Sequence, residues 1–478
     1  MGETEKLYFM GIGGVAMGNM AAACKELGYQ VIGSDAGLYP PTSTLIEKLG
    51  IPVFIPYDAE NISRANPDRV IIGNVIRATN PEVQRIFEHK IPYMSITDLI
   101  DKVFLSRHKS LVVAGTHGKT TTTALLAWTL TEAGYDPSAL VGGFVKQWDC
   151  GYRLGNGDWV VLEGDEYDTA FFDKTPKFWH YRPYGAIVTS VEFDHGDIYP
   201  NLEAVKNAFK TFASLIPPEG FLVVKHEDPH REELAKVCKG RIISYGVEDG
   251  ATFRLISVIP QQQSAIVTYQ RKEGRIASFR LPLIGKHNAL NALAVSAVLE
   301  ELGIEPGRFS ELFEKFPGVK RRQEVIGEWT DGTGNITLID DFAHHPTAVK
   351  ETIHAVKNHY IGRRIVVVFE PRTNTSKRKF FQDVYPNAFT GSDLVFFKAP
   401  ADYETIPSEE RIDIEAIASS AKNNGQTKDA RSFFNTDELV EYLSRAIRPG
   451  DVVLFMSNGS MDGIPQKTKT VLDERLGR

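Results

Sequence analysis

Residues 110–123 read SLVVAGTHGKTTTT, an apolar strand that runs directly into a glycine-rich turn and a helix. Such a loop presents backbone N–H groups to phosphate, while the lysine reaches the outer phosphates and a threonine hydroxyl holds Mg²⁺. The spacing departs from GxxxxGK[ST], because residue 113 is valine. A turn that merely begins a helix is the alternative, but the preceding strand and following helix favour a phosphate loop. The residues predicted to bind nucleotide here are Gly115, Thr116, His117, Gly118, Lys119, Thr120 and Thr121.

Two acidic sequences follow later strands of the same unit. EGDEYD (residues 163–168) comes after the strand predicted over 159–162, and EFDH (192–195) comes after the strand predicted over 186–190. In a parallel sheet both would emerge at the same carboxyl edge as the phosphate loop. Carboxylate oxygens are the ligands that Mg²⁺ prefers. Either sequence alone is equally well explained as a solvated loop, and the shared edge is what favours a metal site.

A second glycine loop lies near the start of the chain. Gly11, Gly13 and Gly14 follow a strand predicted over 6–10, and Asp35 follows the next strand. This pattern is similar to the dinucleotide fingerprint, which fits NAD, a UDP-sugar or a structural turn. Because a phosphate loop follows in a separate unit, a second phosphate-bearing substrate is favoured over a redox cofactor.

The last third of the chain has two further polar sequences after predicted strands. DDFAHHP spans residues 340–346, and EPRTNT spans residues 370–375. Asp341 near His344 can orient an amine or accept its proton, and Arg372 can clamp a carboxylate. The alternative is structural, with a helix N-cap and a hydrogen-bonded histidine.

Strands alternate with helices along most of the chain, which predicts parallel sheets covered by helices. Between residues 252 and 283 the pattern changes to alternating strand residues, which predicts an antiparallel part. We therefore predict an α/β protein of three domains, over residues 1–108, 109–322 and 323–478. The first and third would be Rossmann-like, and the central one would be a P-loop ATPase-like parallel sheet.

Composition excludes several other classes of protein. The 478 residues are 42% hydrophobic and 24% charged, with a net charge of −7, which argues against disorder and against a nucleic-acid partner. The three cysteines show no CxxC spacing, which favours a reducing compartment. The N-terminal sequence is not that of a signal peptide, and no apolar run is long enough to span a membrane. We expect a cytoplasmic protein that does not bind membranes.

The order of motifs along the whole chain resembles the Mur ligases. These motifs are GIGGVAMG, GTHGKTTT, GDEYD, EFDH, GKHNALNA, KRRQE, DDFAHHPTAV and MSNGSMDG. The resemblance implies an ATP- and Mg²⁺-dependent amide ligase of peptidoglycan metabolism that activates a carboxylate as an acyl phosphate. YPPTSTLIEKLG (39–50), residues 163–183 and EPRTNT resemble most the members that join UDP-N-acetylmuramate to the tripeptide L-alanyl-γ-D-glutamyl-meso-diaminopimelate in recycling. Members that add L-alanine are the alternative.

The resemblance also implies roles for individual residues. Catalytic roles fall to Lys119, Arg322, Asp341 and His344, with His344 and Arg372 binding the amino substrate. ATP would also contact His287, Asn288, Asn291 and Arg322, and the metal would be held by Thr120, Glu163 and His195, with Glu166 as the alternative to Glu163. The UDP-sugar would lie at Gly11, Gly13, Gly14 and Asp35.

Some features depart from the family pattern or stay open. Gly13–Gly14 stands where the tripeptide ligases often have Cys–Gly, and Lys210 is a weak candidate for the carbamylated lysine that some members use. The amino acceptor, the third residue of the peptide and the oligomeric state are not determined. An NAD-dependent oxidoreductase would leave residues 115–121 unexplained, and a non-catalytic nucleotide sensor would leave the clustered acids unexplained.

Overall fold

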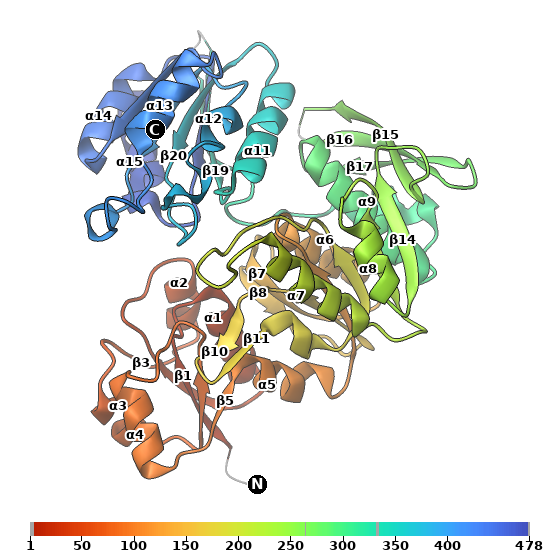
Figure 1. Cartoon of the computed structure of the whole chain (residues 1–478), viewed down its shortest axis with the longest axis vertical. Helices are drawn as coiled ribbons and strands as arrows, with labels where there is room; N and C mark the ends of the chain where they lie inside the picture. Colours follow the sequence, from red (N-terminus) through yellow and green to blue (C-terminus); the bar gives the residue numbers. More distant parts are fainter. Residues whose placement is uncertain (1–3, 263, 331–333, 477–478) are drawn as a thin grey trace.

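The computed structural model describes residues 4–262, 264–330 and 334–476. Within them the strands form a five-stranded, a ten-stranded and a six-stranded sheet, with one separate two-stranded hairpin. In Figure 1 the first part of the chain (red and orange) and the last part (blue) each lie beside the central part (yellow and green). The predicted α/β class with three sheet-based parts is confirmed. The exact boundaries at 108/109 and 322/323 stay a prediction.

The N-terminal sheet is parallel throughout, in the order β3-β2-β1-β4-β5. Its elements are β1 (Lys6–Met10), α1 (Val15–Glu26), β2 (Gln30–Ser34), α2 (Thr42–Lys48), β3 (Val53–Phe54), α3 (Ala59–Ala65), β4 (Arg69–Ile72), α4 (Pro81–His89), β5 (Tyr93–Ser95) and α5 (Ile96–Ile100). The glycine turn of residues 11–14 links β1 to α1, and every residue of β1 after Lys6 is buried. This is the strand–turn–helix unit that the sequence predicts.

The central sheet has the order β17-β16-β15-β14-β13-β12-β6-β9-β7-β8. Its parallel part places β12, β6 and β9 side by side, and β15, β16 and β17 pair antiparallel, as predicted for residues 252–283. The elements are β6 (Lys109–Ala114), α6 (Lys119–Glu132), β7 (Ser138–Val145), β8 (Cys150–Arg153), β9 (Trp159–Glu163), the hairpin β10 (Asp168–Ala170) and β11 (Asp173–Pro176), β12 (Pro183–Val188), α7 (Leu202–Ser214), β13 (Phe221–Lys225), α8 (Arg231–Val237), β14 (Arg241–Gly246), β15 (Phe253–Pro260), β16 (Ala265–Arg271), β17 (Ile276–Leu281), α9 (Lys286–Glu301) and α10 (Phe309–Glu314).

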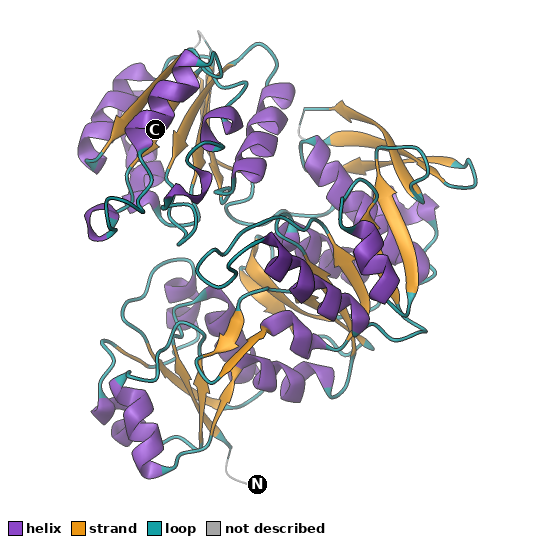
Figure 2. Ribbon diagram, in the orientation of Figure 1, coloured by secondary structure: helices purple, strands orange, loops and turns teal. Residues whose placement is uncertain are grey.

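The C-terminal sheet has the order β18-β19-β23-β20-β21-β22, with β18 as an antiparallel edge. Figure 2 shows helices on both of its faces. Apolar residues of α11, α12 and α13 pack on one face, and those of α14 and α15 pack on the other. The elements are β18 (Glu324–Thr330), β19 (Asn335–Asp341), α11 (Pro346–His359), β20 (Arg364–Phe369), α12 (Tyr385–Ala388), β21 (Leu394–Lys398), α13 (Ile414–Asn423), β22 (Asp429–Phe433), α14 (Thr436–Ala446), β23 (Asp451–Met456) and α15 (Ile464–Leu476).

The three parts are joined in different ways. One apolar cluster runs from the N-terminal into the central part and includes Leu99, Phe104, Phe178 and Tyr181. The C-terminal part contacts the central part through polar side chains, for example where Thr347 donates to Glu192 at 2.7 Å, and through a few aromatic contacts such as Phe193 with Phe380. One shared apolar cluster therefore joins the first two parts, whereas polar contacts and isolated aromatic contacts hold the third.

No helix in the described part of the chain is long and apolar enough to cross a membrane.

The central sheet provides a test of the packing. Ile187 on β12 is 1% exposed, and Ile361 in a surface loop is 81% exposed. We expect Ile187→Ala to cost ~2–5 kcal/mol of unfolding free energy, because it leaves a cavity between sheet and helices. Thermal unfolding measures the loss as a lower midpoint. Ile361→Ala is the matched control and should leave the midpoint unchanged; equal shifts for the two variants would contradict this packing.

Candidate active site

The phosphate loop lies where β6 leaves the sheet, and its two glycines are required by the backbone. Gly115 has φ +132° and Gly118 has φ +77°. A Cβ on Gly115 would lie 2.1 Å from Thr189 Oγ1, and one on Gly118 would lie 3.0 Å from Asn291 Oδ1. The loop is thus packed tightly between the chain after β12 and helix α9. Because α6 begins at Lys119, its first free N–H groups face the loop, as anion binding requires.

Lys119 is held inside the protein by a carboxylate. Its Nζ lies 2.7 Å from Glu166 Oε2 and donates to the Gly115 carbonyl at 2.6 Å. Burial alone would lower the pKa of Lys119, but the charges of Glu166 and Asp165 raise it above its ordinary value. Lys119 is therefore a cation at the mouth of the phosphate loop.

Thr120, Glu163 and Arg322 form a second polar chain beside Lys119. The Thr120 hydroxyl donates to Glu163 Oε1 at 2.9 Å, and Arg322 Nη2 donates to Thr120 Oγ1 at 2.8 Å. Burial raises the pKa of Glu163 despite the nearby positive charges. A buried carboxylate with a raised pKa, next to a hydroxyl oxygen, is a donor set that a hard cation such as Mg²⁺ would stabilise.

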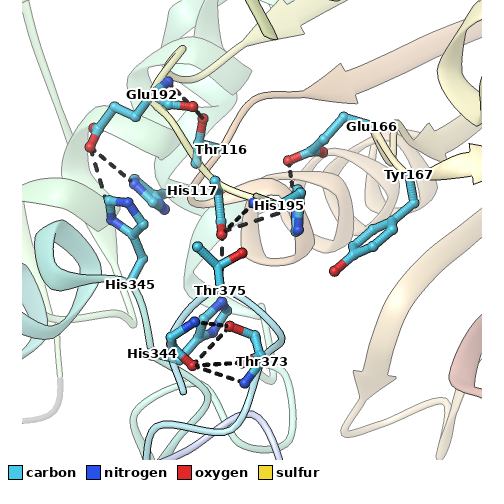
Figure 3. A network of polar contacts seen from close by, with 12 residues as sticks. Thr116, His117, Glu166, Tyr167, Glu192, His195, His344, His345, Thr373 and Thr375 are labelled. Carbon is cyan, nitrogen blue, oxygen red and sulfur yellow. Dashed lines mark hydrogen bonds and ion pairs between the residues drawn. The ribbon is translucent and has the colours of Figure 1, made fainter. Parts of the chain in front are cut away.

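His195 contacts Glu166 rather than Glu163. Its Nε2 lies 3.1 Å from Glu166 Oε1, and among the described residues its buried Nδ1 has no hydrogen-bond partner. Burial disfavours charge on the ring, but the hydrogen bond that its N–H donates to Glu166 raises the pKa of His195. Glu163 and Glu166 thus have separate partners: Thr120 contacts Glu163, whereas His195 contacts Glu166 (Figure 3). The metal set of Thr120, Glu163 and His195 stays a prediction.

Asp341 and His344 come from the C-terminal sheet and face the same region. Asp341 at the end of β19 accepts from the backbone N–H of Gln323 at 2.7 Å and of Ala343 at 2.8 Å. His344 Nε2 lies 3.9 Å from Asp194 Oδ2 in the EFDH sequence. Asp341 therefore fixes the turn after Arg322, while His344 is the side chain that approaches the central domain.

Arg372 lies farther out, at the carboxyl end of β20. Its Nη1 is 3.8 Å from Glu370 Oε2, and the chain at Gly459 passes so close that a Cβ there would lie 2.2 Å from Arg372 Cδ. Arg372 Nη1, Glu370 Oε1 and Asn458 Oδ1 are buried without hydrogen-bond partners in the described part of the structure. One donor, on Arg372, and two acceptors, on Glu370 and Asn458, could therefore form hydrogen bonds with a polar ligand.

A cavity of about 300 Å³ extends from the phosphate loop between the central and C-terminal parts. His287, Asn288 and Asn291 on α9 line it, together with Arg322 and Asp341. Asn288 donates to Gln323 Oε1 at 3.1 Å, which links α9 to the start of the C-terminal part. The sequence did not indicate the residues at the far end of this cavity, which include Glu227, Tyr245, Val247 and Lys286.

The backbone of the N-terminal glycine loop is hydrogen-bonded to the Asp35 side chain. Asp35 Oδ2 accepts from the Gly13 N–H at 2.7 Å, and Oδ1 accepts from Ala36 N–H at 2.7 Å. A Cβ on Gly13 would lie 2.8 Å from Asp35 Oδ2, so glycine is needed for this contact. Gly11 has φ +81°, and Gly14 is the N-cap of α1.

Lys210 lies outside this region. It is on helix α7, where its Nζ is 3.5 Å from Glu233 Oε2 and 3.7 Å from Glu203 Oε1. These are contacts of a surface ion-pair network.

Several side chains at the junction were not indicated as functional by the sequence. Thr375 accepts from the Gly196 N–H at 3.0 Å, and Asn374 donates to Asp197 at 2.9 Å. These contacts seat the EPRTNT loop on the loop that carries His195. Position within the EPRTNT sequence is the only signal that could have pointed to them.

Three family models match the chain in order. The Mur ligase family catalytic domain matches residues 6–108, the Mur ligase middle domain matches residues 113–299, and the Mur ligase glutamate ligase domain matches residues 321–459.

Relatives and solved structures agree with these matches. The chain is 34% identical over 97% of both chains to the UDP-N-acetylmuramate–L-alanyl-γ-D-glutamyl-meso-2,6-diaminoheptandioate ligase of Escherichia coli. It is 34% identical to a UDP-N-acetylmuramate–L-alanine ligase of a Geobacter species, over 96% of both. A murein peptide ligase of Psychrobacter arcticus superposes with a TM-score of 0.74 at 30% identity, over 98% of each chain. The chain therefore belongs to the Mur ligase family, whose members are ATP-dependent ligases that form carbon–nitrogen bonds.

Proposed function

We propose that this protein joins the lactyl carboxylate of UDP-N-acetylmuramate to the amino group of L-alanyl-γ-D-glutamyl-meso-diaminopimelate, with ATP and Mg²⁺. Two curated relatives with these substrates in their names, from Escherichia coli and Haemophilus influenzae, are 34% and 36% identical to it over 97% of the chain. The observation that carries the proposal is the buried Lys119 at the phosphate loop, with Glu163 and Arg322 beside it.

The residues divide the work of acyl-phosphate formation among them. The carboxylate nucleophile and the outer phosphate of ATP are both anions, so their approach requires positive charge. Lys119 supplies it from the loop, and Arg322 supplies it from the junction with the C-terminal part. Both cations are partly covered by the protein, which strengthens their action on a nearby anion because water screens them less than at the surface.

Magnesium fits the same place. Thr120 and Glu163 would hold it, with Glu166 or His195 adjacent, and its positive charge would further neutralise the phosphates. Glu163 is the best anchor, since it already accepts from Thr120 and from the Gly142 N–H at 2.6 Å.

In the second step the amino group of the peptide attacks the acyl phosphate, beside the C-terminal part. The attacking amine must be neutral, and His344 can accept or orient its proton while Arg372 binds a carboxylate of the peptide. Asp341 contributes by holding the turn after Arg322 in place.

The UDP end of the sugar nucleotide would bind at residues 11–14 and Asp35. The three domains would comprise residues 1–108, 109–322 and 323–478.

L-Alanine is the second candidate for the amino substrate. Ligases that are named for it reach the same 34% identity, and the one from Thermotoga maritima superposes with a TM-score of 0.80. The backbone alone therefore does not separate the two substrates.

A substrate comparison tests the proposal. Phosphate release from ATP is measured with Mg²⁺ and UDP-N-acetylmuramate, with the tripeptide and L-alanine offered in parallel. We expect rapid release with the tripeptide and little with L-alanine. The reverse preference would replace the proposal by the L-alanine candidate, and no release with either would contradict both.

Lys119→Ala tests the phosphate loop. We expect loss of nearly all ligation, because removal of a charge that acts on the transferred phosphate costs several kcal/mol. Lys210→Ala is the matched control, since Lys210 lies in the surface network on α7, and it should keep the wild-type rate. Ligation that survives in Lys119→Ala would contradict the role of the loop, and a comparable loss in Lys210→Ala would instead indicate a carbamylated lysine.

Gly115→Ala tests the same loop through its backbone. The new Cβ would collide with Thr189, and we expect nucleotide binding to weaken while far-UV circular dichroism stays unchanged. Gly134→Ala has the same kind of strain, φ +88°, but no described atom lies within 4 Å of its Cβ. Binding by isothermal calorimetry that is equally weak in both variants would show that strain alone, rather than the shape of the loop, is responsible.

A further inference from the structure

A second cluster of potential ligands lies beside the residues assigned to Mg²⁺. It consists of His117, Glu192 and His345, which we call the His–Glu–His cluster; its three ligand atoms all lie within 4.8 Å of one another. The members come from the phosphate loop, the loop after β12 and the N-cap of α11 (Figure 3). The cluster shares no residue with Thr120, Glu163, Glu166 or His195.

The distances are close to those of a tetrahedral metal site. His117 Nε2 lies 3.4 Å from Glu192 Oε2, and His345 Nδ1 lies 4.0 Å from the same oxygen. Zinc bonds of about 2.0–2.1 Å at tetrahedral angles place neighbouring ligand atoms about 3.4 Å apart. One ligand pair already has this separation. The second needs a movement of about half an ångström, and the two histidine nitrogens lie within 4.8 Å of each other.

The hydrogen bonds of His345 leave its Nδ1, the nitrogen nearest to Glu192, available to bind a metal. Its Nε2 faces the Phe193 carbonyl at 3.3 Å, and because a carbonyl only accepts, Nε2 carries the proton. Nδ1 therefore has its lone pair, which now accepts a long 3.3 Å bond from the Thr347 N–H. Metal-binding histidines commonly donate their other N–H to a backbone carbonyl in this way.

The protonation states also suit a cation. Burial lowers the pKa of His345 to about 3, and the His117 ring, whose Nε2 lies 3.4 Å from Glu192 Oε2, holds the pKa of Glu192 at about 2 against the effect of burial. His345 is thus neutral and Glu192 ionised at neutral pH. In the described part of the structure the buried Nε2 of His117 has no hydrogen-bond partner.

We propose that His117, Glu192 and His345 form a binding site for a zinc-class divalent cation, separate from the magnesium site of the proposed ligase. Two imidazoles and one carboxylate favour zinc over magnesium, which prefers a shell of oxygens. His117 and Glu192 line the cavity, so the cluster lies at its wall.

Because the cluster lies between the central and C-terminal parts, a bound cation would restrict their movement. His117 and Glu192 belong to the central part and His345 to the C-terminal part, so the cation bonds the two parts together beside the phosphate loop. Entry of nucleotide and release of product require these parts to separate. Zinc is therefore an inhibitor of turnover, and this consequence, unlike binding itself, rests on the proposed function.

Zinc binding is tested with the full-length protein, without nucleotide and in excess Mg²⁺. A chromophoric chelator competes with the protein for added Zn²⁺, which gives the stoichiometry and affinity. We expect His345→Asn to bind zinc at least about tenfold more weakly, because even residues that only orient ligands contribute ten- to a hundredfold. Asparagine is a good N-cap residue, so it can replace the contact to Thr347 and preserve α11.

Two histidine variants serve as controls. His180→Asn removes a histidine that also lies beside a carboxylate, Asp173 at 3.3 Å, but outside the cluster. His195→Asn removes the histidine of the magnesium region. Both should bind zinc as the wild type does. Equal affinity of His345→Asn and wild type, or a loss confined to His195→Asn, would overturn the site.

Inhibition is measured separately as the zinc concentration that halves phosphate release, relative to each variant's own uninhibited rate. We expect that concentration to rise at least about tenfold in His345→Asn. An unchanged value together with weakened zinc binding would keep the site but overturn its inhibitory role. A wild-type protein that binds zinc but shows no ligation would contradict the proposed function and not the site.

Discussion

Lys119 carries a positive charge in a largely covered position at the phosphate loop, and a charge withdrawn from water is stable only when it is paired. Glu166 provides the pairing at 2.7 Å, and His195 in turn binds the other oxygen of Glu166. The loop glycines, the chain after β12 and helix α9 all close around this pair. A phosphate that enters the loop must compete with Glu166 for Lys119, so the same contact that stabilises the nucleotide-free protein also prepares the site for an anion.

The contacts between the three parts are consistent with the replacement of Glu166 by a phosphate at Lys119. The N-terminal and central parts share an apolar cluster, which keeps the glycine loop of residues 11–14 and the phosphate loop in a fixed relation. The C-terminal part is seated by hydrogen bonds such as Thr347 to Glu192 and Gly196 to Thr375. Such contacts can be replaced by water at little cost. Arg322, which reaches Thr120 at 2.8 Å, then links the position of the C-terminal part to the site of phosphate transfer.

Much of the fold could be predicted from the sequence because local patterns and tertiary packing agree. The structural alternative for residues 340–346 includes a helix N-cap, and His345 is the N-cap of α11. Strand β7 is not predictable from local pattern, because it contains Gly142 and Gly143. Glycine is needed at position 142 because a Cβ would lie 2.7 Å from Glu163 Oε1, a contact that only the folded chain creates. The strand predicted over 186–190 ends at Val188, because Thr189 and Ser190 instead bond to the phosphate loop.

The sequence indicates which segments meet at the site but not which side chains contact each other there. The carboxyl edges of β6, β9 and β12 bring the phosphate loop and both acidic sequences together, as parallel strands require. Which carboxylate faces Lys119 depends on side-chain packing, so the sequence left Glu163 and Glu166 open. The approach of His345 to His117, with ring centres 4.3 Å apart, joins residues more than two hundred positions apart and has no local signal.

When ATP binds, we expect its outer phosphate to replace Glu166 as the partner of Lys119. A crystal structure of the protein with Mg²⁺ and a non-hydrolysable ATP analogue tests it most directly. We expect the γ-phosphate to lie within hydrogen-bond distance of Lys119 Nζ, with Glu166 released toward His195 and the base in the cavity beside Tyr245. A nucleotide bound elsewhere, or a Lys119–Glu166 pair that stays intact with the phosphate out of reach, would contradict it.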